Sequence, residues 1–174
     1  ALSRSGVRVI NVDPGERATG LGWNVDHRSI ARLNRAFRTS VELVNTTLDE
    51  AALPDCSIDT VYSISTIEHI PMTELPALMR EIERILRPGG SCVLSVDLFL
   101  NLKPFSDRES NEFGVNVPPR LLVDASGLEL VSGKRSELLG YPEFDPRAIL
   151  ATLENYLVGS YPALAQCFVL SKPQ

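Results

Sequence analysis

The sequence predicts an α/β domain with a mixed sheet that is mostly parallel and ends in an antiparallel strand. Two observations lead to this prediction. Runs rich in β-branched residues alternate along the chain with amphipathic segments of helical spacing, which is typical of parallel strands joined by helices. The last apolar run is reached by a loop too short for a crossover helix, so we expect that strand to be antiparallel.

The first predicted elements lie in the N-terminal part of the chain. Val7–Val12 is an almost continuous β-branched run that stops at Asp13-Pro14-Gly15, a turn sequence. Ser29–Phe37 carries apolar residues on one helical face, which predicts a helix. Val41–Val44 is predicted to be the second strand.

The central part of the chain has the clearest pattern. Ser57–Ser65 is predicted to be the third strand, and Thr73–Leu86 is the best amphipathic helix. Arg87-Pro88-Gly89-Gly90 is a stop and turn sequence that ends this helix. Ser91–Val96 follows as the fourth strand.

The C-terminal part opens with a long polar stretch, Phe99–Asn116, which has no periodicity. We expect it to be a mobile loop that leaves the carboxyl end of a strand. Four further elements are predicted after it: a helix at 118–125, a strand at 128–131, a helix from 146 to about 157 with Asp145 as its cap, and a closing strand at 166–171.

Composition and charge exclude several classes of protein. The 174 residues are 44% hydrophobic and carry a net charge of −5, which argues for one globular domain and against a nucleic-acid binder with a basic surface. No apolar run approaches the ~18 residues of a membrane span, and the first residues lack the long apolar stretch that is typical of a signal peptide. The widely spaced Cys56, Cys92 and Cys167 indicate reduced, buried thiols and no metal site. We therefore expect a cytoplasmic protein without nucleic-acid or membrane partners.

Candidate site residues are expected where the strands end, because doubly wound sheets bind ligands outside the carboxyl ends of their strands. Four segments reach that edge, and they begin at Asp13, Thr46, Ser63 and Asp97. An acid at a strand end can accept hydrogen bonds from both ribose hydroxyls of a nucleotide. Asp13 meets this description, and so does Asp26, although either acid could instead cap a turn or a helix.

Two central segments resemble class I S-adenosylmethionine-dependent methyltransferases. They are LPDCSIDTVYSISTIEHI (53–70) and LMREIERILRPGGSCVLSV (78–96), with an acid before a strand (Asp59), a Glu-His pair after it, and a helix that runs into Arg-Pro-Gly-Gly. VPPRLLVDASGLELV and ALAQCFVLSK are similar to the family's later helix and its final antiparallel strand. The resemblance implies a Rossmann-like, doubly wound mixed sheet and S-adenosyl-L-methionine as the cofactor.

The family's glycine-rich turn after its first strand has no counterpart here, since Gly15 and Gly20-Leu21-Gly22 are the only candidates. Val7–Val12 therefore most resembles the family's second strand. We expect residues 1–174 to form a single methyltransferase-like domain that is N-terminally incomplete, with Asp13 as the ribose-binding acid. A rival alignment assigns this role to Asp26, but it joins two parallel strands through about eight residues, and a crossover needs ~10–12 or more.

The resemblance also implies the remaining cofactor positions. Thr47 and Leu48 fall beside the adenine ring, and Ser63 and Ser65 fall near the sulfonium end. No catalytic residue is assigned, because methyl transfer needs a base only if the acceptor must lose a proton.

The Glu-His pair at residues 68 and 69 offers a candidate for a general base. His69 is the only evident base candidate, but the simpler interpretation is a helix-entry histidine held by hydrogen bonds. We expect Glu68 to accept hydrogen bonds from backbone or loop donors.

The function implied by the resemblance is methyl transfer from S-adenosyl-L-methionine to a small-molecule acceptor. The alternative is a degenerate methyltransferase-like module that does not bind the cofactor and has a structural or assembly role. A nicotinamide-dependent oxidoreductase is disfavoured, because the chain has neither GxGxxG nor a Tyr-x-x-x-Lys pair. No motif specifies the acceptor or the oligomeric state.

Overall fold

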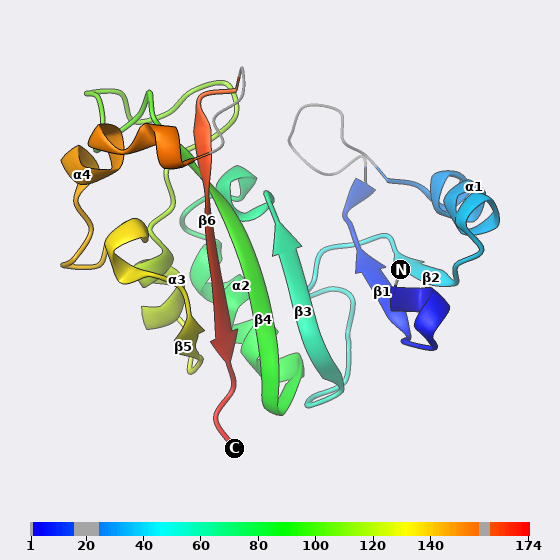
Figure 1. Ribbon diagram of the computed structural model, residues 1–174. Helices are drawn as coiled ribbons and strands as arrows, with labels where there is room; N and C mark the ends of the chain where they lie inside the picture. Colours follow the sequence, from blue (N-terminus) through cyan, green and yellow to red (C-terminus); the bar gives the residue numbers. More distant parts are fainter. Residues whose placement is uncertain (1, 16–24, 157–160) are drawn as a thin grey trace. The chain divides into compact units, whose positions relative to one another are not determined.

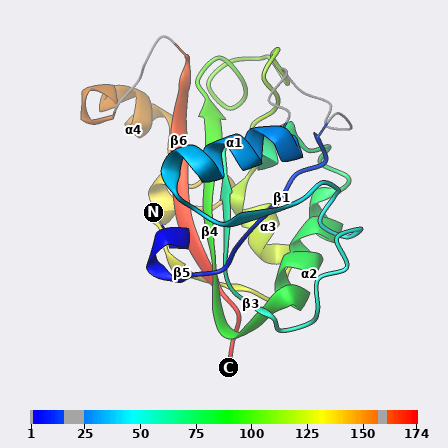
Figure 2. The same ribbon diagram turned by 90° about the vertical axis from the view of Figure 1, so that its right-hand side faces the viewer.

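The computed structural model describes residues 2–15, 25–156 and 161–174, and the chain divides into two compact units, residues 1–53 and 54–174. Figure 1 shows the elements of both units, and Figure 2 shows them turned by 90°. Each unit is described by itself. The single domain expected for residues 1–174 stays a prediction.

The first unit contains two parallel strands and one helix. β1 (Val9–Val12) pairs with β2 (Val41–Val44) from Val9 opposite Val41 to Val12 opposite Val44. A single turn of 3₁₀-helix (Leu2–Ser5) precedes β1, and helix α1 (His27–Phe37) leads into β2. These elements confirm the predicted strand, helix and strand, with β1 starting two residues later than the sequence pattern indicates.

The second unit holds a four-stranded sheet in the order β3-β4-β6-β5. β3 runs parallel to β4, β4 antiparallel to β6, and β6 antiparallel to β5. Three of the four strands therefore point the same way and only the C-terminal strand is reversed, which confirms the predicted mixed α/β fold. The strands are β3 (Ile58–Ile64), β4 (Leu86–Phe99), β5 (Glu129–Ser132) and β6 (Ala163–Ser171).

The helices of the second unit are α2 (Leu75–Ile85), α3 (Pro119–Asp124) and α4 (Pro146–Ala151). Figure 2 shows α2 and α3 on the same side of the strands β3, β4 and β6. The apolar stripe of α2 is buried there with alternate residues of β4 and β6, as the period-2 pattern of strands requires. The buried residues of this core are Leu75, Met79, Ile82, Ile85, Cys92, Leu94, Val96, Phe168 and Leu170.

Three boundaries that differ clearly from the sequence prediction are the starts of β4 and β6 and the end of α4. β4 begins at Leu86 rather than Ser91, because Leu86 pairs with Ile58 across the Arg-Pro-Gly-Gly segment. β6 begins at Ala163 rather than Gln166, and Ala163 pairs with Phe99. Helix α4 ends at Ala151 rather than near 157, since Thr152 leaves helical geometry and its Oγ1 donates back to the Ala148 carbonyl at 2.8 Å.

The cysteines correct one expectation. Cys92 is buried, but Cys56 and Cys167 are exposed, so only one of the three is a buried thiol. Residue type alone favours burial of cysteine, whereas Cys56 lies in the loop before β3 and Cys167 on the less buried face of β6. Within the described residues, no three His, Cys, Asp or Glu side chains gather as a candidate metal site. None of the described helices has the length and apolarity of a membrane span.

Hydrogen bonds between its two ends stabilise the loop 99–116. The Asn116 side chain accepts from the Phe99 amide at 2.6 Å and donates to the Phe99 carbonyl at 2.9 Å. Leu102, inside the loop, is fully buried. The predicted mobility of this loop is a question for solution measurements.

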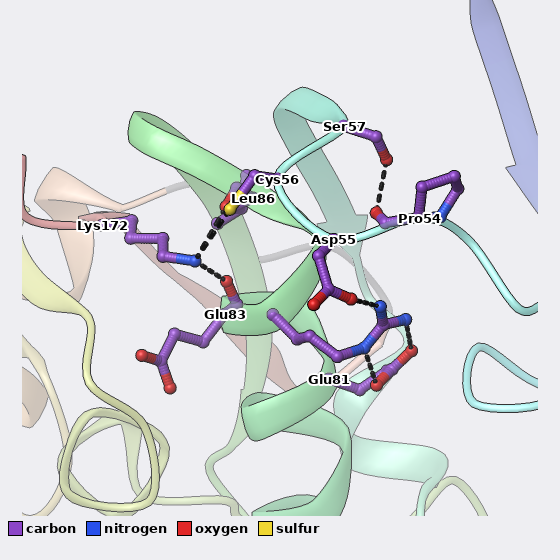
Figure 3. A network of polar contacts seen from close by, with 9 residues as sticks. Pro54, Asp55, Cys56, Ser57, Glu81, Glu83, Leu86 and Lys172 are labelled. Atoms are coloured by element: carbon purple, nitrogen blue, oxygen red, sulfur yellow. Dashed lines mark hydrogen bonds and ion pairs between the residues drawn. The ribbon is translucent and has the colours of Figure 1, made fainter.

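Figure 3 shows a polar network that includes the start of β3 and the end of α2. Lys172 donates to the carbonyl oxygens of Glu83 and Leu86 at 2.8 and 3.0 Å. Arg84 bonds both Asp55 and Glu81. The network joins the C-terminal tail, the loop before β3 and helix α2, and lies away from the carboxyl ends of the parallel strands β3 and β4.

Candidate functional site

The carboxyl ends of β1 and β2 lie at the same edge of the first unit. The Asp13 amide donates to the Val44 carbonyl at 3.1 Å, and the Asn45 side-chain amide donates to the Asp13 carbonyl at 2.8 Å. These two bonds hold the residues that leave the strands against one another. The structure therefore brings Asp13 together with the segment that contains Thr47 and Leu48.

Asp13 forms a tight turn at this edge. Its Oδ1 accepts from the Gly15 amide at 2.7 Å, and Gly15 has the positive φ of 61° that the turn needs. Among the described residues, no hydrogen bond to the second carboxylate oxygen is found. One oxygen of Asp13 thus fixes the turn, and the other has no partner in the part of the chain that the structure describes.

Asp26 is the N-cap of helix α1. Its Oδ1 accepts from the Ser29 amide at 2.6 Å, and the hydrogen bonds from Ser29 lower the pKa of this carboxyl. Asp26 and the preceding Val25 lie outside any strand, while Gly20-Leu21-Gly22 falls outside the described residues. The helix cap explains Asp26 without a ligand.

Thr47 and Leu48 lie in the turn that follows β2, and both are half-buried. The Thr47 carbonyl accepts from the Ala51 amide at 3.0 Å, and Thr46 hydrogen-bonds the Val44 carbonyl and the Glu50 side chain. The turn is thus held by backbone and side-chain bonds. It leaves the Thr47 hydroxyl and the Leu48 side chain as the groups that can meet a ring.

Ser63 and Ser65 lie in the second unit, at the end of β3. Ser63 pairs with Leu94 inside the ladder. Ser65 follows the strand with a positive φ of 46°, donates its amide to the Ser95 carbonyl at 2.8 Å, and donates its hydroxyl to Asp97 Oδ1 at 3.1 Å. The sharp turn at Ser65 therefore directs its side chain to the acid on β4.

Glu68 contradicts the expectation that backbone or loop donors satisfy it. Its side chain is 1% exposed, and neither carboxylate oxygen has a hydrogen-bond partner in the described part of the chain. Burial raises the pKa of Glu68 to about 7. The nearby backbone amides of Glu68 and Asp97 oppose this rise in part, and the charge of Asp97 adds to it. An unpartnered buried carboxyl with this pKa is typical of functional sites.

Tyr161 lies in the same region, which we call the Glu68 cluster (Ser65, Glu68, Asp97 and Tyr161). Burial raises the pKa of Tyr161 to about 12, and the charges of Asp97 and Glu68 contribute. The Tyr161 ring meets the edge of Phe113 with centroids 4.5 Å apart. The sequence predicts Asp97 at this edge, whereas Tyr161 has no motif around it that would indicate its place here. His69, the base candidate of the sequence analysis, is exposed.

Comparison with known proteins now identifies the family. The family described as "Methyltransferase domain" matches residues 1–94, more than half of the chain. The chain belongs to this family. The match confirms the resemblance to class I S-adenosylmethionine-dependent methyltransferases. The residues that the resemblance assigns to the cofactor lie inside the matched range, whereas Asp97 lies just beyond it.

Relatives of this methyltransferase domain agree with that assignment. A Mycolicibacterium smegmatis protein named "Probable S-adenosylmethionine-dependent methyltransferase" is 32% identical over 101 residues, which are 58% of this chain and 37% of that protein. The chain thus spans little more than a third of that relative's length.

Two solved structures share the fold of the methyltransferase domain. One is the Burkholderia thailandensis 1,6-didemethyltoxoflavin-N1-methyltransferase, solved with 1,6-didemethyltoxoflavin and S-adenosylhomocysteine. Its TM-score is 0.57 at 15% sequence identity, and the alignment covers 98% of this chain and 74% of the Burkholderia chain. The other is the [4+2]-cyclase SpnF, with a TM-score of 0.60 at 17% sequence identity. The alignment covers 96% of this chain and 74% of the SpnF chain. Since one of these is named as a cyclase, the fold alone does not fix the reaction.

Proposed function

We propose that this methyltransferase domain takes part in methyl transfer from S-adenosyl-L-methionine to a small-molecule acceptor. One observation carries the proposal beyond family membership: among the described residues, only one carboxylate oxygen of Asp13 accepts a hydrogen bond, and Asn45, two residues before Thr47, bonds the Asp13 carbonyl at the same strand edge. A ribose diol and an adenine ring need this combination of an acceptor and a nearby apolar contact.

The residues of the first unit that fit the cofactor have separate roles. Asp13 would accept from the ribose hydroxyls, and Leu48 would contact the adenine ring, with the Thr47 hydroxyl beside its amino group. In the second unit, Ser63 and Ser65 are the residues proposed for the sulfonium end. The cofactor supplies the reactive methyl group when bound, and these side chains bind and orient.

Asp13 rather than Asp26 is proposed as the ribose-binding acid. Both are acids of the first unit, but Asp26 is committed to the cap of α1, whereas Asp13 ends β1. The degenerate-module alternative predicts no binding at either acid. The small-molecule acceptor is supported by the name of the Burkholderia enzyme, which acts on a small heterocycle.

The test is a titration of a ¹⁵N-labelled sample of the chain with S-adenosylhomocysteine up to millimolar concentration, in which the backbone amide NMR signals report binding. NMR detects weak binding, which we expect because the sequence offers no clear glycine-rich turn. A micromolar site corresponds to a binding free energy of about −8 kcal/mol, and each hydrogen bond to a charged ligand that is lost weakens it by ~1.5–3 kcal/mol. We expect shifts at Asp13, Thr47 and Leu48.

Two variants decide the roles of the acids. Asp13→Ala should weaken binding by about tenfold or more. Asp26→Ala is the matched control: it should destabilise α1 by ~0.5–2 kcal/mol and leave the affinity unchanged. Loss of binding in Asp26→Ala alone would move the ribose site to Asp26, and an absence of any shifts would favour the degenerate module.

A further inference from the structure

A cavity of about 260 Å³ lies in the second unit, near the carboxyl end of β4. Leu98, Ile149 and Leu164 form its apolar wall, and these three residues are the buried centre of a small cluster beneath α4. The polar side chains that line it include Glu137, Tyr156 and Gln166. Neither the sequence motifs nor the proposed methyl transfer assigns a role to this cavity.

Gln166 is the unusual residue of the cavity. It is 3% exposed, and its Oε1 accepts from the Leu139 amide at 2.8 Å. Because an amide N–H can bond only to the oxygen of a glutamine side chain, this contact fixes which way the Gln166 amide faces. Its Nε2 is then a buried donor, and it has no hydrogen-bond partner among the described residues.

The charges around the cavity restrict what the donor can meet. Glu137 lines the wall, and its Oε1 accepts from Lys134 Nζ at 2.7 Å and from the Tyr156 hydroxyl at 3.3 Å. Because Glu137 is paired with Lys134, this wall carries no net charge that would attract either an anion or a cation. A neutral ligand fits this wall.

Size and lining define the rest of the ligand. A dry apolar cavity of about 150 Å³ holds benzene, so 260 Å³ has room for one ring with a small substituent. We propose that this cavity binds a neutral, mostly apolar molecule of single-ring size, whose carbonyl oxygen accepts a hydrogen bond from Gln166 Nε2. The site requires no methyl transfer and goes beyond the function proposed above.

The probes are acetophenone and ethylbenzene, which differ in the carbonyl oxygen that the proposal requires. Binding is followed by NMR of a ¹⁵N-labelled chain, whose only two glutamines are Gln166 and Gln174. We expect acetophenone to shift the Gln166 side-chain NH₂ signals and to bind about three- to tenfold more tightly than ethylbenzene, which is the effect of one buried hydrogen bond.

Two matched variants complete the experiment. Gln166→Met removes the NH₂ donor at a similar side-chain length and cannot ionise, so the preference for acetophenone should disappear. Gln174→Met makes the same chemical change at the exposed C-terminus and should keep the preference. Equal affinity of the two probes, an unchanged preference in Gln166→Met, or no shift of any cavity residue would each overturn the proposal.

Discussion

The ammonium of Lys172 closes the C-terminal end of helix α2, where it donates to the carbonyl of Glu83 at 2.8 Å although 89 residues separate the two. A second bond to the Leu86 carbonyl, at 3.0 Å, completes the contact. The last carbonyls of a helix have no partner within the helix, and a cation there also meets the negative end of its dipole. Lys172, a residue of the C-terminal tail, thus caps helix α2.

The first prediction concerns this cap. Lys172→Met should lower the free energy of unfolding by ~1–3 kcal/mol, because it leaves two carbonyl oxygens without their charged donor. Urea denaturation measures the effect. Lys134→Met is the control, since its ion pair with Glu137 is exposed and should contribute under ~1 kcal/mol. Equal losses in the two variants would contradict the capping role.

The second prediction concerns pH and Glu68. The pKa of Glu68 is about 7 in the folded protein and ordinarily 4.5, so between these values the folded state keeps a proton that the unfolded state has lost. Stability should therefore fall as the pH rises from 4.5 to 7, with a contribution from this group on the order of 3 kcal/mol.

Glu68→Gln cannot ionise and should lack this component. The unfolding free energy of the variant relative to the natural chain should rise steadily between pH 4.5 and 7, and stay constant below 4.5. Glu112→Gln, at an exposed glutamate of the nearby loop, should follow the natural chain. Parallel pH profiles for the natural chain and Glu68→Gln would show that Glu68 titrates normally.

The third prediction concerns the loop over Glu68. A Cβ at Gly114 would lie 2.4 Å from the Glu68 carbonyl oxygen, and Gly114 has a φ of 148°. Gly114→Ala should displace the loop, cost about 2 kcal/mol or more, and expose Glu68. We expect the Glu68 pKa, followed by ¹³C NMR of its carboxyl, to fall toward 4.5.

Gly89→Ala supplies the comparison for this variant. Gly89 also has a positive φ, of 74°, but a Cβ there meets nothing closer than 4.0 Å. The Gly89→Ala variant should be destabilised by backbone strain alone, and the titration of Glu68 should be unchanged in it. A Glu68 pKa that stays near 7 in Gly114→Ala would mean that the loop does not cause its burial.

The fourth prediction concerns thiol chemistry. Cys56 and Cys167 are exposed, whereas burial raises the pKa of Cys92 to about 12. Because the thiolate is the reactive form, a chromogenic disulfide reagent should label two thiols of the folded chain quickly and the third only on unfolding. Cys92→Ala should leave the fast count at two. Three fast thiols would contradict the burial of Cys92.

The fold could be predicted where local pattern decides it. The apolar stripe of α2 and the β-branched runs of β1 and β2 are each specified within a few residues, and all three are found. Boundaries set by distant partners were missed: β4 extends back to Leu86 because Ile58 pairs with it.

The site divides in the same way. The turn at Asp13, where this acid is proposed to bind ribose, could be predicted because a strand followed by a turn sequence marks it. The burial of Glu68 could not, since Gly114, which packs against the Glu68 carbonyl, lies 46 residues later in the chain. The open donor of Gln166 depends likewise on the distant amide of Leu139.

The position of β6 has a consequence for the order of folding. This strand is the last in the sequence, yet it lies between β4 and β5, and it pairs with β4 along nine residues from Ser91 to Phe99. During synthesis, the residues of β6 follow their partners in β4 by 64 to 80 residues, and β5 has no partner until β6 is made. The second unit should therefore assemble late and cooperatively, when the C-terminal strand leaves the ribosome and joins the two halves of its sheet.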